Sequence, residues 1–160
     1  MLRGGQFVAE MRGLTSQLQQ VIGNVYTSSC RAALGDAKCG INLSALTVTG
    51  AVTAIETAYA FTDSTKTQAN DYFADGVVHF TSGANYGLSM EVRDFTAGRF
   101  GLFLPMPYGI ALGDTFTVSA GCDKQFDTCV SKFHNAVNFR GEPDVPGTDK
   151  LLETAATRST

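Results

Sequence analysis

The central part of the chain alternates hydrophobic and polar residues with the two-residue period of β-strands. Residues 46–55 alternate in this way and are rich in Thr and Val, which favours a strand there. In residues 88–95, apolar positions alternate with polar and charged ones, which predicts a strand with one face toward solvent. Further strand patterns occur at residues 59–61, 76–80, 99–104 and 115–119.

Hydrophobic residues take up helical spacing near both ends of the chain. Residues 8–22 place apolar side chains at helical intervals, and Gly23-Asn24 would end such a helix. After Ala120, a second helical stripe is formed by Cys122, Phe126, Cys129 and Phe133. The sequence therefore predicts a mainly β fold, a small antiparallel barrel or sandwich, with short N- and C-terminal helices that carry a four-cysteine site.

Length and charge favour a single-domain protein and argue against nucleic-acid-binding and membrane-spanning proteins. The chain has 160 residues, and we expect a single domain over residues 1–147 with a flexible polar tail over residues 148–160. The formal net charge of -3 argues against nucleic-acid binding, because no basic stripe is available to neutralise phosphates. The apolar stretches are much shorter than the roughly 20 residues of a membrane span. The N-terminus lacks the apolar region of a secretory signal, so we expect synthesis in the cytosol.

The candidate chemistry lies in four cysteines, which form one pair on each side of the β region: Cys30, Cys39, Cys122 and Cys129. Two disulfides, a structural zinc site, an iron–sulfur cluster and four unrelated core cysteines are the competing interpretations. Disulfides are disfavoured in a reducing cytosol, where clustered cysteines more often bind metal.

The surroundings of the cysteines favour a metal or a cluster. Cys30 and Cys39 are flanked by polar and turn residues, and Cys122 and Cys129 have the spacing of one helical face. Glycines near both pairs, such as Gly40, would let the backbone approach a bulky group. Neither pair has the short spacing of a zinc knuckle, but spacing alone does not separate an iron–sulfur cluster from zinc.

Other polar residues have simpler interpretations. His79 is expected to be a structural or surface residue of a strand, and His134 to lie at a solvated helix end. Residues 138–141, Asn-Phe-Arg-Gly, predict a turn with Phe139 in the core. The hydrophobic residues between 100 and 108 are expected in the core or at an interface. No catalytic motif occurs, so an enzyme is the least supported class.

Two longer segments resemble the hub proteins of phage-like tails. One is residues 121–147, with the pattern G-C-D-K-x-F-x-T-C-x-x-K-F-x-N-x-x-N-F-R-G-x-P-x-x-P-G. The other is residues 25–43, with V-Y-x-x-x-C-x-x-x-L-G-D-x-x-C-G-I-x-L, preceded by M-R-G-L at residues 11–14. The family includes the hub proteins of gene transfer agents. The cysteine spacing is also similar to that of the iron–sulfur C-terminal domain of lambda-like tail tip proteins.

This resemblance implies a structural virion protein and no enzyme. Its cofactor would be a 4Fe–4S cluster, with zinc as the less favoured occupant, and the ligands would be Cys30, Cys39, Cys122 and Cys129. The alternatives are a zinc-stabilised binding module and a small redox protein.

The resemblance further implies where the chain belongs. It would be the C-terminal domain of a hub (baseplate) protein at the virion tail tip, made and assembled in the bacterial cytoplasm. A homotrimer is implied, with the distal tail ring, the tip or fibre protein and the tail peptidase as partners. Hub proteins of the family are longer, with a preceding N-terminal part, so the chain is expected to be a fragment or the product of a split gene.

Overall fold

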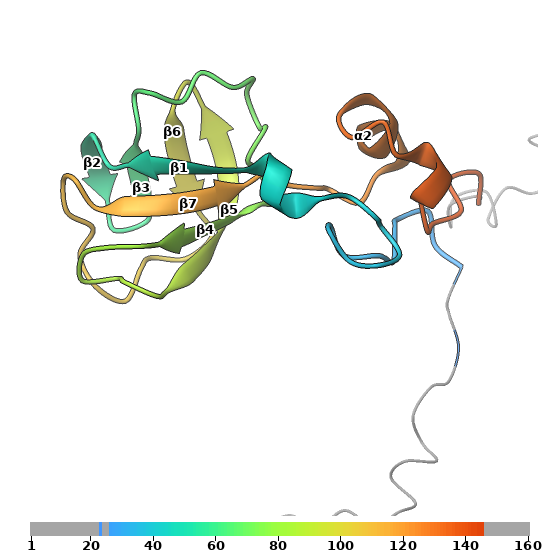
Figure 1. Ribbon diagram of the computed structural model, residues 1–160, viewed down its shortest axis with the longest axis horizontal. Helices are drawn as coiled ribbons and strands as arrows, with labels where there is room; N and C mark the ends of the chain where they lie inside the picture. Colours follow the sequence, from blue (N-terminus) through green and yellow to red (C-terminus); the bar gives the residue numbers. More distant parts are fainter. Residues whose placement is uncertain (1–22, 24–25, 146–160) are drawn as a thin grey trace, which may run out of the picture.

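The computed structural model describes residue 23 and residues 26–145 of the chain (Figure 1). The helix predicted over residues 8–22 and the tail predicted over residues 148–160 lie outside the described residues. The strands occupy one part of the molecule, and α2 lies in a second, smaller part (Figure 1). The elements are η1 (Leu43–Leu46), β1 (Thr47–Ala51), β2 (Ala54–Thr57), β3 (Ala60–Thr62), β4 (Val77–Phe80), β5 (Ser89–Thr96), β6 (Arg99–Leu102), β7 (Thr115–Ser119), α2 (Phe126–Ser131) and η2 (Ala136–Asn138).

The strands form one antiparallel sheet, which confirms the mainly β prediction. Its order is β1-β7-β4-β5-β6-β3-β2, and the sheet curls into a half-barrel. The patterns at residues 76–80, 88–95 and 115–119 match β4, β5 and β7 within one residue. Alternating sequence therefore predicts these strands well, because each keeps one face in the core and one in water.

The curl arises where strands change partners. The first half of β5 pairs with β4, and its second half pairs with β6 after a register shift between Val92 and Asp94. A β-bulge of this kind bends a strand and increases its twist. Residues 46–55, predicted as one strand, are in fact divided between β1 and β2. At the break the Val52 N–H donates to Asp114 O, whereas the Thr53 N–H donates to Thr62 O, so the chain passes from one side of the sheet to the other.

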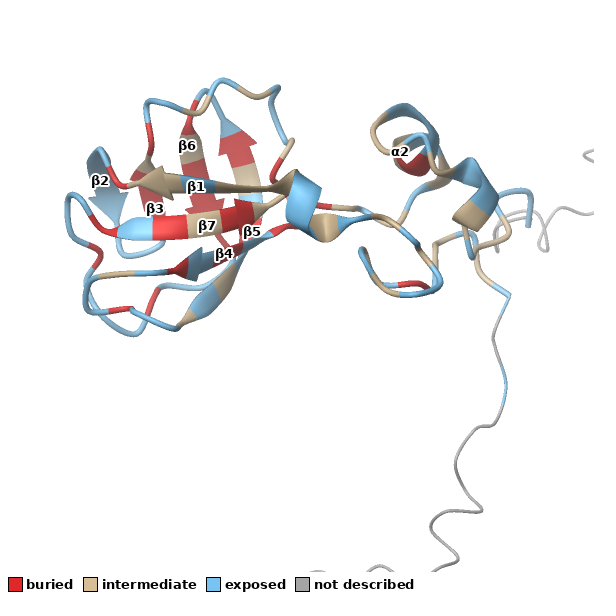
Figure 2. Ribbon diagram, viewed as in Figure 1, coloured by how far each residue is buried: buried red, intermediate tan, exposed pale blue. Residues whose placement is uncertain are grey.

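Buried residues, coloured red in Figure 2, lie mainly in the half-barrel, and many of them are aromatic. Phe61 stacks on Phe100 with ring centroids 5.2 Å apart, and both rings contact Phe116 edge-on. Fully burying one such ring stabilises the fold by about 1.5–3 kcal/mol. Among the described residues, six phenylalanines are fully buried: Phe61, Phe73, Phe80, Phe95, Phe100 and Phe116. Of the hydrophobic residues between 100 and 108, the buried ones are Phe100, Leu102 and Met106, and the exposed ones are Phe103, Leu104 and Tyr108.

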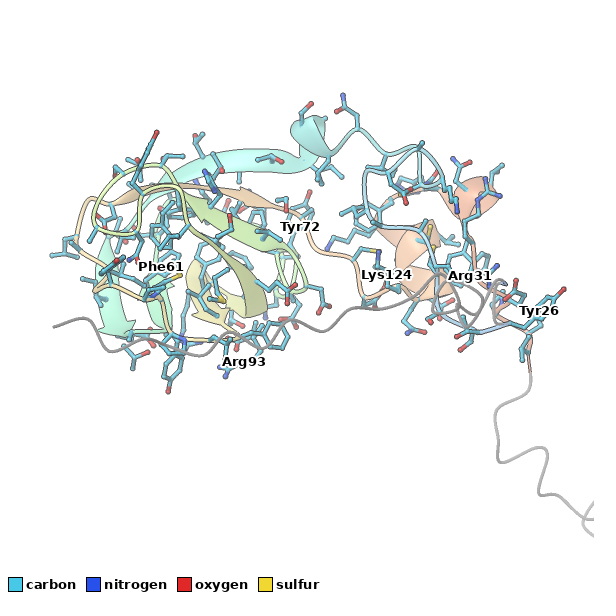
Figure 3. All side chains as sticks on the ribbon, turned by 90° about the horizontal axis from the view of Figure 1, so that it is seen from below. Tyr26, Arg31, Phe61, Tyr72, Arg93 and Lys124 are labelled. Carbon is cyan, nitrogen blue, oxygen red and sulfur yellow. The ribbon has the colours of Figure 1, made fainter. Side chains whose placement is uncertain are left out.

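A second, smaller part of the molecule contains both cysteine segments, residues 26–42 and 122–145 (Figures 1 and 3). We call it the cysteine lobe. In Figure 3, Arg31 and Lys124 lie in this lobe, and Tyr72 lies at the end of the half-barrel that faces it. No helix among the described residues is long and apolar enough to cross a membrane.

The helix of the cysteine lobe is shorter than the stripe from 122 to 133 predicts. Only Phe126–Ser131 is α-helical, so Cys122 lies before the helix and not on its face. Lys124 has a positive φ of 64°, which a right-handed helix does not allow. The Asp123 carboxylate accepts hydrogen bonds from the Gln125 N–H (2.9 Å) and the Thr128 hydroxyl (2.7 Å). These bonds favour a turn in front of the helix over its extension.

Candidate metal centre

The first cysteine segment is organised by one carboxylate. Asp36 accepts hydrogen bonds from the N–H groups of Ala33 (2.9 Å), Lys38 (2.9 Å) and Cys39 (2.7 Å). The bonds from Cys39 and Ala33 lower the pKa of Asp36 below its ordinary value of 3.8. Gly40 then follows with a φ of +71°, which glycine adopts without strain. Cys39 is therefore held in a turn that forms from contacts between residues close to it in the sequence.

The second cysteine segment joins the first through backbone hydrogen bonds. The Cys30 N–H donates to Lys124 O (2.8 Å), and the Arg31 N–H donates to Arg140 O (3.3 Å). The Lys124 ammonium donates to Ala32 O (2.6 Å). Segments about 90 residues apart in sequence therefore lie side by side, as Arg31 and Lys124 do in Figure 3.

An ion pair also joins the two cysteine segments. The Arg31 guanidinium donates to both oxygens of Glu142, at 2.7 and 2.9 Å. Glu142 also accepts a hydrogen bond from the Thr27 N–H (3.1 Å). The hydrogen bond from Arg31 lowers the pKa of Glu142 below its ordinary 4.5, so Glu142 stays charged near neutral pH.

All four predicted cysteines line one pocket between the two segments. The pocket is narrow and mostly apolar. Cys129 is buried and the other three cysteines are half-buried, and all four are free thiols. The apolar side chains around the sulfur atoms are Ala32, Leu34, Ile41, Phe133 and Phe139.

Hydrogen bonds orient three of the four sulfur atoms. The Arg140 N–H donates to Cys30 Sγ (3.4 Å). The Asn135 side-chain amide donates to Cys39 O (2.7 Å) and, at 3.8 Å, to Cys39 Sγ. The Cys129 thiol donates to Asn135 O (3.4 Å). Contacts from N–H groups to sulfur are favourable to thiolate ligands, because they stabilise the negative charge on sulfur.

Burial keeps two of the thiols protonated. Desolvation raises the pKa of Cys122 and of Cys129 above the ordinary value of 9.0. For Cys129, negative charge on the other three cysteines raises the pKa further. Since only the thiolate is a metal ligand, occupation of this pocket by a metal group would release protons.

The described residues contain no preformed site for a single metal ion. Among them, no three His, Cys, Asp or Glu side chains are grouped closely enough to hold one. A single zinc ion needs all its sulfur ligands about 2.3 Å from one point, whereas the four thiolates of a 4Fe–4S cluster bind different iron atoms.

One lysine connects the cysteine lobe to the half-barrel. The Lys132 ammonium donates to Tyr72 O (2.6 Å) and Gly121 O (2.8 Å), and it lies 4.8 Å from the centre of the Tyr72 ring. Burial lowers the pKa of Lys132 below 10.5. Gly121 approaches Ala74 O so closely that no side chain fits there. The position of Cys122 is therefore tied to the half-barrel at the residue before it.

The remaining sequence candidates lie elsewhere or have structural roles. His79 is exposed on β4 and its Nδ1 is 2.9 Å from Ser89 Oγ. His134 has a φ of 50° just after α2, at a helix end as expected. Phe139 packs edge-on against Phe126, in the cysteine lobe and not in the core of the half-barrel. Sequence reasoning missed the roles of Asp36 and Asn135, although both stand inside the segments that resemble hub proteins.

Comparisons with known proteins cover most of the chain. A sequence model of the family described as phage conserved hypothetical protein BR0599 matches residues 71–149. A model described as the baseplate hub protein, N-terminal attachment domain, matches residues 1–42. No curated protein matches the chain.

A solved structure gives a third, independent match. One chain of the virion of a native gene transfer agent (GTA) particle has 29% sequence identity and a TM-score of 0.72. The match covers 93% of this chain and 54% of that chain, so the present chain spans about half the length of its structural relative. From the two sequence models and this structural match, the chain belongs to the phage baseplate hub protein family.

Proposed function

We propose that the chain is a structural component of the tail hub of a phage-like particle, and that its four cysteines hold a 4Fe–4S cluster. The observation that carries the cluster proposal is the shared pocket of Cys30, Cys39, Cys122 and Cys129. In the sequence, one of these segments precedes the strands of the half-barrel and the other follows them. Their meeting is therefore a property of the fold and not of local sequence.

When bound, the cluster would supply four iron–thiolate bonds that crosslink the two segments. The chain's own residues prepare this crosslink. Asp36 shapes the turn of Cys39, Lys124 joins its segment to Ala32, and Arg140 directs an N–H at Cys30. Such a crosslink constrains the unfolded chain in the way a disulfide does, but it persists in a reducing cytosol.

The family of the chain supports a proposal for its place in the particle. It belongs to the baseplate hub at the tail tip of a virion that resembles the gene transfer agent particle. In the assembled tail it is a homotrimer, with the distal tail ring, the tip or fibre protein and the tail peptidase as its partners. The match to one chain of a virion supports tail proteins as neighbours.

Metal analysis of anaerobically purified protein tests the cluster. Iron, zinc and acid-labile sulfide are measured together with the visible spectrum. We expect iron and sulfide in equal amounts, about four of each per chain, and a brown sample. A matched variant, Cys39→Ser, should lose most of the iron while keeping the half-barrel folded.

The other outcomes are equally clear. Zinc without sulfide would identify the chain as a zinc-stabilised module. Free thiols without any metal after anaerobic reconstitution would contradict the cluster, and the hub assignment would then depend on the family match alone.

A further inference from the structure

One residue of the pocket contacts two cysteines from different segments, one through its side chain and the other through its backbone. The Asn135 amide nitrogen donates to the backbone oxygen of Cys39 at 2.7 Å and reaches Cys39 Sγ at 3.8 Å. The backbone oxygen of the same residue accepts the hydrogen bond of the Cys129 thiol at 3.4 Å. Asn135 therefore lies between the first and second cysteine segments, with its side chain toward Cys39 and its backbone oxygen toward Cys129.

The orientation of this amide is set by a second asparagine. The Asn138 amide nitrogen donates to Asn135 Oδ1 at 2.8 Å, which leaves the Asn135 nitrogen as the atom that faces Cys39. Asn138 in turn lies against Gly40, where an added side chain would come within 3.4 Å of the Asn138 amide. Both asparagines are half-buried and line the cysteine pocket, so solvent competes only partly for their hydrogen bonds.

We propose that Asn135, oriented by Asn138, is a positioning residue that holds Cys39 toward the metal group and donates an N–H to its sulfur. This inference rests on the proposed function, because it assigns a role around the same pocket. An N–H donor stabilises negative charge on a thiolate ligand. A cluster carries more negative charge when reduced, so the donor raises the reduction potential of the cluster.

Two variants of Asn135 separate this role from simple packing. Asn135→Asp keeps the size and the oxygen that accepts from Asn138, but replaces the donor with an acceptor. Asn135→Ala removes both. On anaerobically reconstituted protein we expect a lower midpoint potential for both variants, measured by redox titration of the visible spectrum, and the larger shift for Asn135→Asp. Iron loss to a chelator should be roughly 10-fold faster in both.

A matched control is available in the half-barrel. Asn85 is fully buried, and its amide donates to Tyr108 O (3.0 Å) and accepts from the Tyr108 N–H (3.1 Å), far along the chain from the cysteines. Asn85→Ala should lower the thermal stability and leave the midpoint potential of the cluster unchanged. Asn138→Ala should lower the potential by less than Asn135→Asp does, because the Asn135 amide remains but is no longer oriented.

The two proposals fail in different ways. If the parent chain takes up no iron and sulfide, the proposed cluster is wrong and the inference about Asn135 is wrong with it. If the parent is loaded but both Asn135 variants match its potential and its iron retention, the cluster stands and the role of Asn135 is overturned. An equal shift in Asn85→Ala would also overturn it, since the effect would then be one of general stability.

Discussion

At the scale of single residues, the buried carboxylate of Asp63 is held in the half-barrel by several hydrogen bonds. Asp63 is 1% exposed, and its carboxylate accepts from the Thr65 hydroxyl (2.7 Å), the Thr65 N–H (2.9 Å) and the Ala51 N–H (3.2 Å). Burial raises the pKa of Asp63, but the hydrogen bonds from Thr65 and the nearby charge of Lys66 outweigh it. The pKa is therefore lowered from its ordinary 3.8.

This lowered pKa predicts an acid-dependent contribution to stability. Because the folded-state pKa lies below the unfolded value of 3.8, Asp63 stabilises the fold above that pH, and the contribution is lost as pH falls through the folded-state pKa. We expect Asp63→Asn to lower the free energy of unfolding by about 1–3 kcal/mol at neutral pH. The amide group of the new asparagine would place its own N–H donors against the N–H and hydroxyl groups that donate to the carboxylate. The free energy of unfolding of the variant should fall less steeply with acid than that of the parent.

Denaturant titrations at a series of pH values between about 5 and 2 measure both effects. Asp127→Asn, at an exposed carboxylate of α2, is the control and should follow the parent. Curves for the parent and Asp63→Asn that stay parallel over this range would contradict the assignment.

At the scale of elements, the connection from β7 to the cysteine lobe depends on close backbone packing. A side chain at Gly121 would collide with the Ala74 oxygen, and one at Gly76 would collide with the Ser119 oxygen. These neighbours are backbone atoms that cannot rotate away. The two glycines thus let β7 leave the sheet beside the loop that precedes β4.

The packing predicts a large effect of one added methyl group. Gly121→Ala should lower the free energy of unfolding by about 1–3 kcal/mol, because the backbone has to move to accommodate Cβ. Gly109→Ala is the matched control, since nothing lies within 4 Å of an added Cβ there. Chemical denaturation of both variants provides the comparison, and equal midpoints would show that the junction accommodates the methyl group.

At the scale of the whole molecule, Lys132 joins the cysteine lobe to the half-barrel. Lys132→Met keeps the length of the side chain but removes the bonds to Tyr72 O and Gly121 O. We expect a loss of about 1–3 kcal/mol and faster hydrogen exchange at the Gly121 N–H, which donates to Tyr72 O. Lys38→Met, on the exposed part of the lobe, should change neither quantity, and unchanged exchange in Lys132→Met would exclude this connection.

The proposed cluster joins the two segments of the cysteine lobe to each other, and it thereby closes a loop of the chain that contains the whole half-barrel. Cys122→Ser should therefore destabilise the cluster-loaded protein by several kcal/mol, on the order of a long-loop disulfide. In metal-free protein, the same substitution should have little effect, because the crosslink is already absent. Thermal unfolding before and after removal of iron checks this, and equal melting of the loaded parent and variant would disprove the crosslink.

The sequence by itself determined the strands and the candidate ligands. The alternation of apolar and polar residues predicts β4, β5 and β7, because successive side chains of a strand point to opposite faces of the sheet and the apolar ones face the core. The four cysteines stood out as candidates because their residue type carries the chemistry. Resemblance to hub proteins, carried by residues 25–43 and 121–147, also lay in the sequence, and the family matches confirmed it.

Only the tertiary structure decided how these parts meet. The break at Val52 depends on its hydrogen bond to Asp114 O. The late start of α2, at Phe126, depends on the conformation of Lys124, whose backbone oxygen accepts a hydrogen bond from Cys30. The pocket unites cysteines that are distant in sequence, and Asn135 becomes a bridge only when both segments are present. Non-local contacts of this kind leave no periodic pattern along the chain, because each partner's position is set by the path of the half-barrel between them.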